Sequence, residues 1–327
     1  MTDKAPDGNN CKDVAVVIVS WNVKPLLAEC LVSVLECLVR SNLDAKVWVV
    51  DNASHDGSAE MVREQFPQVQ LIASPKNLGF ARGNNCALRA LDPHLPRYVL
   101  LLNPDTKVRS NALATMVHFM DERPSVGVCG PRLLYGDGSF QHSAFGFPDL
   151  AQILLDFFPL HWRLTESRLN GRYPRRLYEG GVPFEIDHPL GAAMMLRREV
   201  ILQTGLFDEG YRMYVEEIDW CMRIRREGWD ICCVPSAVVV HHAGQSTQQV
   251  RNQMFVALWR SRFRLFDKHY NRMFRWAARR LVGLGLQAEA SRARAAHRRG
   301  DLSAQELAGW LSALHQVRHE SQKCSLI

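Results

Sequence analysis

The sequence lacks the features of a membrane-spanning or disulfide-bonded protein. No apolar run approaches the roughly eighteen residues of a spanning helix, and the polar segment 1–12 does not resemble a signal peptide. The nine cysteines are irregularly spaced and contain no CxxC pair. These absences argue against a disulfide framework and a zinc site. We therefore expect reduced thiols in a cytoplasmic protein, with residues 1–12 as a disordered tail.

The sequence also lacks the glycine-rich signatures of two common nucleotide-binding modules. The turn after the first apolar run, Val19-Ser20-Trp21-Asn22, has no glycine of a GxGxxG fingerprint, and GxxxxGK[ST] is absent. No internal repeat or low-complexity tract is present. The chain is therefore not expected to be a dinucleotide-binding or P-loop module.

Charge is unevenly distributed along the 327 residues. The whole chain has a net charge of +6, but residues 251–300 contain twelve Arg and one Lys against one Asp and one Glu, a balance of +11. The rest of the chain is then acidic, at about −5. An acidic body with a basic C-terminal segment indicates an anionic partner, either a membrane surface or a nucleic acid.

Apolar runs alternate with amphipathic segments over the first 131 residues. Continuous apolar runs are typical of strands buried on both faces, and the segments between them have helical spacing. The alternation predicts an α/β fold, a mostly parallel sheet with helices on both sides. The predicted strands are 14–20, 47–50, 69–73, 98–102 and 126–129. The predicted helices are 25–40, 59–66 and 111–122. A further helix is predicted to end at residue 91, and a loop at 77–85 precedes it.

The pattern changes after Pro131. Residues 136–139 predict a hairpin turn. Residues 143–183 show no regular hydrophobic period. We therefore expect a variable insertion or a mobile loop, lying over the side of the fold where a second substrate, the acceptor, would bind. Regular patterns then return: residues 189–196 predict a small-residue turn into a strand. Further predicted strands are 231–234 and 237–240, and the predicted helices are 198–203 and 216–227.

The turn Asn103-Pro104-Asp105 follows a buried apolar run. Proline cannot continue a central strand, so Asp105 is delivered to the carboxyl end of the strand, where open α/β sheets bind ligands. A carboxylate there can hold a divalent cation and, through it, a diphosphate. Trp21 and Asp51 follow the first two strands and could stack on a base and accept a hydrogen bond from its ring N–H. The structural alternatives are a core tryptophan and a turn-forming aspartate.

Three acids, Glu216, Glu217 and Asp219, stand at the start of a predicted helix. The helix dipole alone favours acids there, and Asp219 can form an i,i+4 pair with Arg223. The functional alternative is that one of these acids is a general base, because attack by an alcohol on a sugar carbon requires removal of the hydroxyl proton.

Two histidines, His241 and His242, follow the last predicted strand. A lone histidine is usually a structural residue. At a strand end, downstream of the acidic helix, one of them could join Asp105 on a metal ion, because imidazole and carboxylate both ligate Mn²⁺ and similar ions.

Seven motifs resemble, in order and approximate spacing, those of the family 2 glycosyltransferases. The resemblance covers residues 14–247 and is strongest to the rhamnosyltransferase-like branch of bacterial surface polysaccharide synthesis. The combined pattern is highly specific, although no single motif is. The motifs are VVIVSWN, VVDNASHDGS, NLGFARGNN, LLLNPDT, GAAMMLRR, EEIDWCMRIRREGW and HHAGQST.

The resemblance implies a GT-A fold and an inverting, metal-dependent transferase that uses Mn²⁺ or Mg²⁺. The implied donor is a nucleotide diphosphate sugar such as dTDP-rhamnose, and the implied acceptor is a saccharide or a polyprenyl-linked saccharide. The catalytic domain is expected at 13–246, with a nucleotide-sugar-binding half at 13–131 and an acceptor-binding half at 132–246. A basic helical extension is expected at 247–327.

The resemblance also implies residues that bind the donor. Asp51 stands at the position of the base-binding acid, and Trp21 stands where an aromatic ring stacks on the nucleobase. Asn103 replaces the first acid of the family's DxD motif and is expected near the sugar or ribose. Arg82 and Asn84 are expected in a loop that faces the donor.

The metal and the general base are assigned by the same resemblance. Asp105 is the remaining acid of the DxD motif, and His241 stands at the metal-ligating histidine, with His242 as the register alternative. Glu217 stands at the general base in place of the more usual Asp, so its arm is one methylene longer and Glu216 is the alternative.

The C-terminal segment 251–299 has aromatic residues at helical spacing with arginines between them. Such helices either bind an anionic membrane surface or pack on the catalytic body or a partner subunit. Polyprenyl-linked acceptors favour peripheral contact with the inner face of the cytoplasmic membrane. No nucleic-acid-binding module is recognised, and a homo-oligomer is left open. The aromatic positions are Phe255, Trp259, Phe263, Phe266 and Tyr270.

Two other functions share part of this pattern. A nucleotidyltransferase would share the nucleotide site but would have a glycine-rich basic loop after the first strand, where this chain has VSWNVKP. A non-catalytic, membrane-associated sugar-nucleotide-binding or scaffold protein would not require the full set of Asp51, Asp105, Glu217 and His241. Glycosyl transfer is therefore the expected function.

Overall fold

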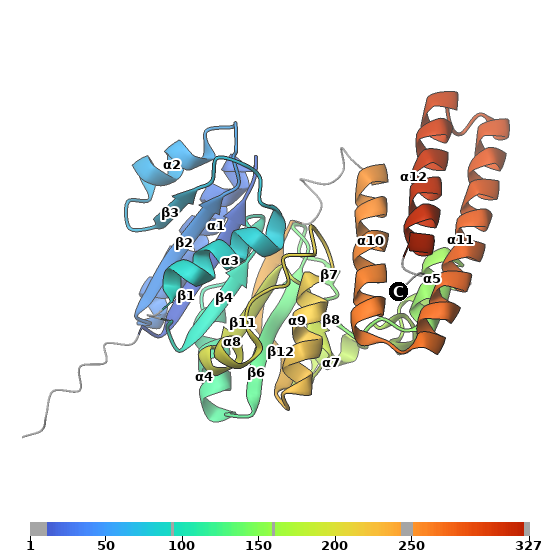
Figure 1. Ribbon diagram of the computed structural model, residues 1–327. Helices are drawn as coiled ribbons and strands as arrows, with labels where there is room; N and C mark the ends of the chain where they lie inside the picture. The colour runs from blue at the N-terminus through green and yellow to red at the C-terminus, as the bar shows by residue number, and fades with distance from the viewer. Residues whose placement is uncertain (1–11, 93–94, 159–160, 243–250, 324–327) are drawn as a thin grey trace, which may run out of the picture.

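The computed structural model describes residues 12–92, 95–158, 161–242 and 251–323. The predicted tail apart from Lys12, and the predicted boundary at 246–247, lie outside these ranges. An α/β part and a group of helices lie side by side (Figure 1). The group of helices consists of α5 (Leu150–Phe157), α10 (Arg251–His269), α11 (Arg272–Arg299) and α12 (Ala304–Lys323).

The central sheet is built on two strands that are almost wholly apolar in sequence. β1 (Val14–Ser20) pairs in parallel with β2 (Ala45–Asp51) on one side and with β4 (Tyr98–Leu102) on the other. β2 pairs in parallel with β3 (Gln70–Ala73). The strand order is β3-β2-β1-β4-β11-β6-β12-β5. The predicted α/β sheet is thus confirmed, with its most apolar strands at the centre.

Helices cover both faces of this sheet, as the alternation predicts. Side chains alternate between faces along a strand, so Val16 of β1 lies in one buried cluster with Leu27 of α1, and Val17 lies in another with Leu88 of α3. The continuous apolar run therefore contributes to two cores. The first core is covered by α1 (Lys24–Ser41), α2 (Ser58–Gln65) and α4 (Ala112–Glu122), the second by α3 (Gly79–Leu91), α8 (Arg198–Thr204) and α9 (Glu216–Arg226).

The second half of the sheet differs from the prediction in two ways. β11 (Ala193–Arg197) lies antiparallel between β4 and β6 (Val126–Leu134), so the sheet is mixed although most of its long strands are parallel. The two short strands predicted at 231–234 and 237–240 are one strand, β12 (Asp230–His241), which pairs with β6 through a register shift between Val234 and Val238. Proline is tolerated at such an irregularity, and Pro235 lies inside it.

The described residues of 143–183 form short helices and strands and not the loop that was one of the two predictions for this segment; the other, a variable insertion, stays a prediction. A hairpin turn at 136–139 joins β6 to β7 (Phe140–Gln141), as predicted. Short elements follow, and Ile153 and Phe157 of α5 are buried among the C-terminal helices. No single period appears in the sequence because each element is too short to show one. These elements are β8 (Ala144–Phe145), α5, α6 (Trp162–Thr165), the 3-10 helix Arg168–Asn170, α7 (Arg175–Glu179), and then β9 (Phe184–Glu185) and β10 (His188–Pro189).

The predicted C-terminal extension is helical over residues 251–323. Its aromatic positions Trp259, Phe263 and Phe266 are buried in a core shared by α5, α10, α11 and α12. Of the two interpretations, packing within the protein therefore holds for these three aromatics, and membrane contact of the extension stays a prediction. Spacing of three or four residues places them on one face of α10, and the other helices cover that face.

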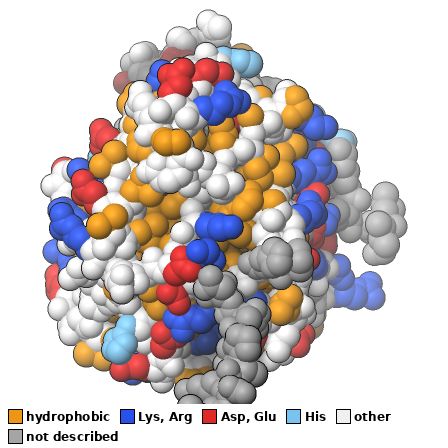
Figure 2. Space-filling view, turned by 90° about the vertical axis from the view of Figure 1, so that its left-hand side faces the viewer, with side chains coloured by type: hydrophobic (Ala, Val, Ile, Leu, Met, Phe, Trp, Pro, Cys, Tyr) orange, Lys and Arg blue, Asp and Glu red, His pale blue; other side chains and the backbone are white. Residues whose placement is uncertain are grey.

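Figure 2 shows the face beside β3 and α2, where hydrophobic side chains form a band and charged side chains of both signs lie around it. The helices α10, α11 and α12 lie on the other side of the molecule. Among the helices of the described ranges, none is both long enough and apolar enough to span a membrane. The basic extension and the sheet edge therefore present separate surfaces.

Trp259→Ala tests the buried aromatic core of the extension. Trp259 is 2 % exposed, so its truncation is expected to lower the free energy of unfolding by about 3–5 kcal/mol. Trp276→Ala, on the exposed side of α11 with 64 % of the residue accessible, is the matched control and should change it by less than about 0.5 kcal/mol. Urea unfolding followed by circular dichroism measures both. Equal losses would contradict this assignment of the core.

Candidate active site

A cavity of about 360 Å³ opens at the carboxyl ends of β1 and β4. This is the edge of the sheet where α/β proteins bind ligands. Segments far apart in the sequence meet there. The lining residues include Trp21, Asn52, Asn77, Gly79, Phe80, Asn103, Asp105, Gly191, Tyr214, Glu216, Glu217 and His241.

The turn after β4 is held by short local contacts. Thr106 donates from Oγ1 to the Asn103 carbonyl at 2.7 Å, and the Cys30 thiol of α1 lies 3.6 Å from the same oxygen. The Asn103 amide donates to the Ala192 carbonyl at 2.9 Å. The turn is therefore fixed from α1 and from the segment before β11, which keeps Asp105 at the cavity.

Asp105 and His241 are brought together, as predicted. His241 Nε2 lies 3.4 Å from Asp105 Oδ1, because β12 pairs with β5 (Thr106–Val108) in a register that places His241 opposite Thr106. The adjacent His242 does not line the cavity and packs against Gly136. Of the two histidines, only His241 is positioned to share a ligand with Asp105.

Gln141 is a site residue that the sequence analysis missed. Its Oε1 accepts a hydrogen bond from His241 Nδ1 at 3.2 Å. With Nδ1 as the donor, Nε2 presents its lone pair to Asp105, an arrangement that fits a shared cation. The described residues contain no group of three or more His, Cys, Asp or Glu arranged for a metal. The sequence indicates a position for Gln141 only through the predicted hairpin turn at 136–139, which it follows.

A strained turn positions the two glutamates. Tyr214 and Val215 have φ angles of 67° and 73°, in the left-handed region that a β-branched residue rarely adopts. Such strain persists where the surrounding structure holds it and often lies at functional sites. Val215, buried with Tyr211, directly precedes α9, so Glu216 and Glu217 begin the helix beside the cavity.

The pKa of each glutamate is raised. For Glu216 the cause is burial and then the negative charge of Glu217, and its Oε2 has no hydrogen-bond partner among the described residues. For Glu217 the cause is burial, opposed by backbone hydrogen bonds at the helix start. Glu217 lies against Gly191, where an added methyl group would be 3.6 Å from its carboxyl carbon. Glu216 is buried and Glu217 is half-buried, so Glu217 is more accessible to a ligand.

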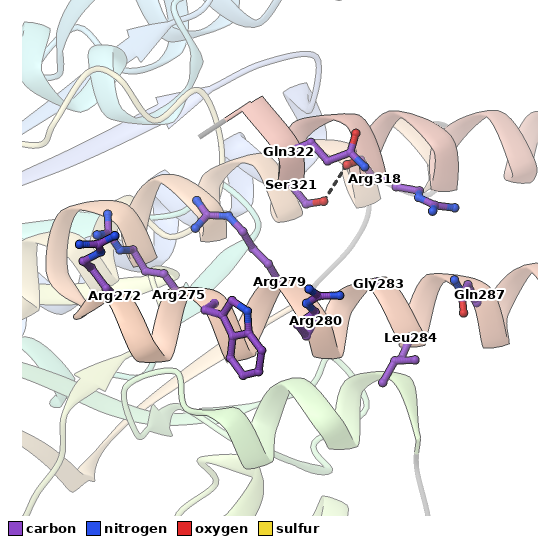
Figure 3. Close-up of a pocket in the computed structure, with 11 residues that line it drawn as sticks. Arg272, Arg275, Arg279, Arg280, Gly283, Leu284, Gln287, Arg318, Ser321 and Gln322 are labelled. Atoms are coloured by element: carbon purple, nitrogen blue, oxygen red, sulfur yellow. Dashed lines mark hydrogen bonds between the residues drawn. The ribbon is translucent and has the colours of Figure 1, made fainter. Parts of the chain in front are cut away.

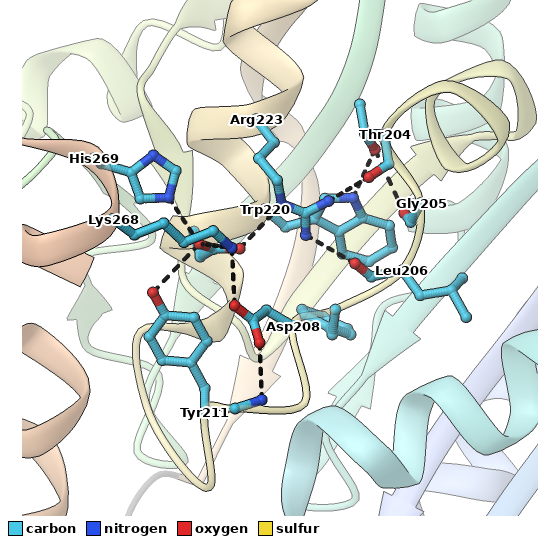
Figure 4. A network of polar contacts seen from close by, with 12 residues as sticks. Thr204, Gly205, Leu206, Asp208, Tyr211, Trp220, Arg223, Lys268 and His269 are labelled. Atoms are coloured by element: carbon cyan, nitrogen blue, oxygen red, sulfur yellow. Dashed lines mark hydrogen bonds and ion pairs between the residues drawn. The ribbon is translucent and has the colours of Figure 1, made fainter. Parts of the chain in front are cut away.

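Asp219 has a structural role and ties α9 to the C-terminal extension through Lys268 and His269, which Figure 4 shows pointing toward α9 beside Arg223 and Trp220. It is fully buried and accepts from His269 Nε2 and Lys268 Nζ, each at 2.7 Å, and from Arg223 Nε at 3.0 Å. Burial alone would raise the pKa of Asp219, but the hydrogen bonds from His269 and Lys268 and the Arg223 charge lower it well below its ordinary value. The i,i+4 pair with Arg223 was predicted, whereas the partners from α10 were not.

Of the residues predicted to bind a base, Trp21 lines the cavity and Asp51 does not, whereas Asn52, which was not predicted, does. Trp21 is exposed. Asp51 is buried at the end of β2. Its Oδ2 accepts from the Ser54 amide at 3.0 Å, and its Oδ1 accepts no hydrogen bond from the described residues. Asn52 lines the cavity and holds the next loop through the Leu78 amide and the Gly79 carbonyl, each at 3.2 Å.

Arg82 and Asn84 lie in α3, and the predicted loop at 77–85 is wrong beyond its first residues. Gly79, at φ +77°, starts the helix earlier than expected. Arg82 Nε lies 3.5 Å from Glu209 Oε2, and buried Asn84 donates to the Phe80 carbonyl at 3.0 Å. Neither side chain lines the cavity.

The architecture is that of a GT-A glycosyltransferase. Mannosyltransferase PcManGT from Pyrobaculum calidifontis, solved with GDP-Man and Mn²⁺, superposes with a TM-score of 0.55. The alignment covers 98 % of this chain and 88 % of that one at 17 % identity, a likeness of fold. The expectation of a GT-A fold is therefore confirmed.

The chain belongs to glycosyl transferase family 2, whose family model matches residues 15–203. The N-acetylglucosaminyl-diphospho-decaprenol L-rhamnosyltransferase of Mycobacterium tuberculosis is 28 % identical over 286 residues, which are 82 % of this chain and 90 % of that protein. Rhamnosyltransferase WbbL of Escherichia coli is 24 % identical over 212 residues, 62 % of this chain and 72 % of that protein. The predicted enzyme class, a glycosyltransferase, and the resemblance to the rhamnosyltransferase-like branch are confirmed.

Asp219→Asn tests the link between α9 and the extension. The free energy of unfolding at pH 7 should fall by ~3 kcal/mol, because the variant leaves the buried His269 ring without its carboxylate, although exposed Lys268 keeps Asp208 at 2.9 Å. The folded pKa lies below the ordinary unfolded value of about 3.9. The ionised carboxylate therefore stabilises the fold fully above that pH, and this stabilisation is lost as the pH falls toward the folded pKa.

Urea unfolding between pH 7 and pH 3 measures both effects, and the Asn variant should lose less stability on acidification than the wild type. Asp44→Asn is the control, because Asp44 pairs with Lys12 at 2.6 Å on the surface and should contribute less than about 1 kcal/mol. If the two variants lose the same free energy of unfolding, the buried contacts of Asp219 contribute no more to stability than a surface ion pair, and this assignment is contradicted.

Proposed function

We propose that this chain is an inverting, metal-dependent rhamnosyltransferase that moves L-rhamnose from dTDP-rhamnose to a saccharide or polyprenyl-linked saccharide in cell-surface polysaccharide synthesis. The observation that supports a transferase mechanism best is that Asp105 and His241 line the same cavity as Glu216 and Glu217. The choice of rhamnose rests on the rhamnosyltransferases among its relatives, those of Mycobacterium tuberculosis and Escherichia coli. A lipid-linked acceptor would place the enzyme at the inner face of the cytoplasmic membrane.

The donor is expected to lie across the strand ends. Trp21, which lines the cavity, would stack on the thymine. Asp51 is buried and does not line the cavity. Its place at the end of β2, and an Oδ1 that accepts no hydrogen bond from the described residues, support the proposal that it would accept one from the thymine ring N–H. Asn103 would face the ribose or the sugar. Arg82 and Asn84 are left out of this proposal because Arg82 pairs with Glu209 and buried Asn84 donates to the Phe80 carbonyl of its own helix.

Asp105 and His241 would hold the divalent cation, Mn²⁺ or Mg²⁺. When bound, this cation acts as a Lewis acid that stabilises the departing nucleoside diphosphate. Gln141 would keep the Nε2 lone pair of His241 directed at the site, because its Oε1 accepts a hydrogen bond from the Nδ1–H.

Glu217 would act as the general base. It takes the proton of the acceptor hydroxyl, and the oxygen attacks the anomeric carbon as the bond to the diphosphate breaks on the opposite face. Buried Glu216 stays protonated because the charge of Glu217 raises its pKa further. A single displacement needs one carboxylate at the carbon, unlike the paired acids of a glycoside hydrolase.

Release of nucleoside diphosphate from dTDP-rhamnose, UDP-sugars and GDP-sugars tests the transferase, with a mixed lipid extract as the acceptor source. Release is expected from dTDP-rhamnose, and EDTA should abolish it. Asp105→Asn and Glu217→Gln should each lower kcat by at least ~100-fold, as the loss of a transition-state contact or a general base does. The exposed Glu64→Gln on α2 is the control and should retain wild-type turnover.

The outcomes separate the parts of the proposal. Release that survives EDTA and Asp105→Asn would overturn the metal site. Release from another donor would overturn rhamnose and keep the transferase. Donor binding by calorimetry without release from any donor would favour a non-catalytic sugar-nucleotide-binding protein.

The pH profile distinguishes the two glutamates. A general base must be deprotonated, so kcat/KM should fall as the pH drops below a raised pKa, well above the ordinary glutamate value of about 4.3. Glu216→Gln should stay within tenfold of wild type and keep this acid limb, because Glu216 is already neutral when Glu217 ionises. A loss in Glu216→Gln as large as that in Glu217→Gln would make Glu216 the base.

A further inference from the structure

The helix α11 has an exposed apolar stripe that no described element covers. Met273 is 82 % exposed, Trp276 64 % and Leu284 58 %. Their spacing of three and eight residues places them on one side of the helix. The opposite side, with Ala278, Val282 and Leu286, is buried in the core of the extension. Exposed apolar groups gathered on one face, rimmed by polar residues, mark an interaction surface.

Arginines surround this stripe. A groove of about 730 Å³ between α11 and α12 is lined by Arg272, Arg275, Arg279 and Arg280 of α11 and by Arg318 of α12 (Figure 3). Asp267 pairs with Arg279 at 2.7 Å and lies 3.6 Å from Arg275. For the other three arginines, no carboxylate partner occurs within the described ranges. The groove therefore keeps an uncompensated positive charge.

The apolar and cationic groups form a continuous surface. The Arg280 guanidinium lies 5.7 Å from the centre of the Trp276 ring, in cation–π contact. Trp276 and Leu284 line the same groove as the arginines. Tryptophan favours the headgroup region of a bilayer, and arginine binds lipid phosphates from the same depth.

We propose that this surface, formed by Arg272, Met273, Trp276, Arg280, Leu284 and Arg318 and here termed the arginine face, docks on the surface of an anionic lipid bilayer. Met273, Trp276 and Leu284 would enter the headgroup boundary, and the arginines would pair with lipid phosphates. It extends the proposed action on a membrane-bound acceptor by naming the docking surface. Lipid binding itself requires neither donor nor acceptor.

A bilayer matches this surface better than other anionic partners do. A nucleic acid would account for the arginines but not for exposed Met273 and Leu284, because its phosphate contacts need no apolar stripe. Exposed tryptophan and leucine bordered by arginines suit interfacial binding, because the apolar side chains can enter the headgroup boundary while the cations meet anionic lipid. The net charge of +11 over residues 251–300 adds long-range attraction to anionic lipid.

The full chain is tested by co-sedimentation with vesicles, one set of phosphatidylcholine alone and one with about 30 % phosphatidylglycerol, close to the anionic content that gives a membrane surface a marked negative potential. The wild type should bind only the anionic vesicles, and salt should weaken binding. Trp276→Ser and the triple variant Arg272→Gln/Arg280→Gln/Arg318→Gln should each bind at least tenfold more weakly. Circular dichroism melting verifies that both variants remain folded.

Two controls match these changes on the other side of the molecule. Val39→Ser removes an apolar side chain that is 84 % exposed on α1. Arg40→Gln/Lys46→Gln/Arg63→Gln removes the same charge from exposed positions of α1, β2 and α2. Both should bind vesicles within twofold of the wild type.

Three outcomes would overturn the proposal that the arginine face docks on a bilayer. The first is that the wild type does not bind anionic vesicles. The second is that the control triple variant loses as much vesicle affinity as the triple variant of the arginine face, and the third is that the wild type binds duplex DNA more tightly than vesicles. Because the vesicles contain neither donor nor acceptor, these outcomes are independent of whether the chain transfers rhamnose.

Discussion

The pairing of β12 with β5 is the constraint on which the candidate site depends. This antiparallel pairing sets His241 opposite Thr106, directly after Asp105, and thereby brings the imidazole to the carboxylate. A shift of one residue would exchange His241 for His242 and turn its side chain to the other face of the sheet. The irregularity around Pro235 divides the ladder of β12 with β6 into two parts of different register. The second part, Val238–Val240, overlaps the residues that pair with β5, so the register at the site differs from that of Asp230–Val234.

The glutamates depend on a second set of constraints at the start of α9. The positive φ angles of Tyr214 and Val215 cost conformational energy, and burial of Val215 holds them in place. One turn further along, Asp219 is bound by Lys268 and His269 from the end of α10. Removing a partner from a buried ion pair is strongly destabilising. The basic extension therefore supports the helix that presents Glu216 and Glu217, whatever else its surface binds.

Some elements of this fold could be predicted from local sequence patterns, and others could not. Strands such as β1 and β4 were predictable because a continuous apolar run has no other stable place than the centre of a sheet. Segment 143–183 was not predictable because its helices are shorter than the window in which a period can be seen. Arg82 and Asn84 were misplaced because glycine and asparagines suggested a loop, whereas packing of α3 on the sheet overrode that preference.

The sequence by itself determined the alternation of strands and helices, the delivery of Asp105 to a strand end, and the gathering of acids at the start of α9. These follow from local periodicity and turn chemistry, which act over a few residues. Tertiary structure alone decided that His241 and not His242 meets Asp105, that Gln141 orients it, and that Asp219 turns toward α10. It also buried the aromatics of α10 and left Trp276 exposed. Each of these depends on strand register or on which helix face is covered, and long-range contacts set both.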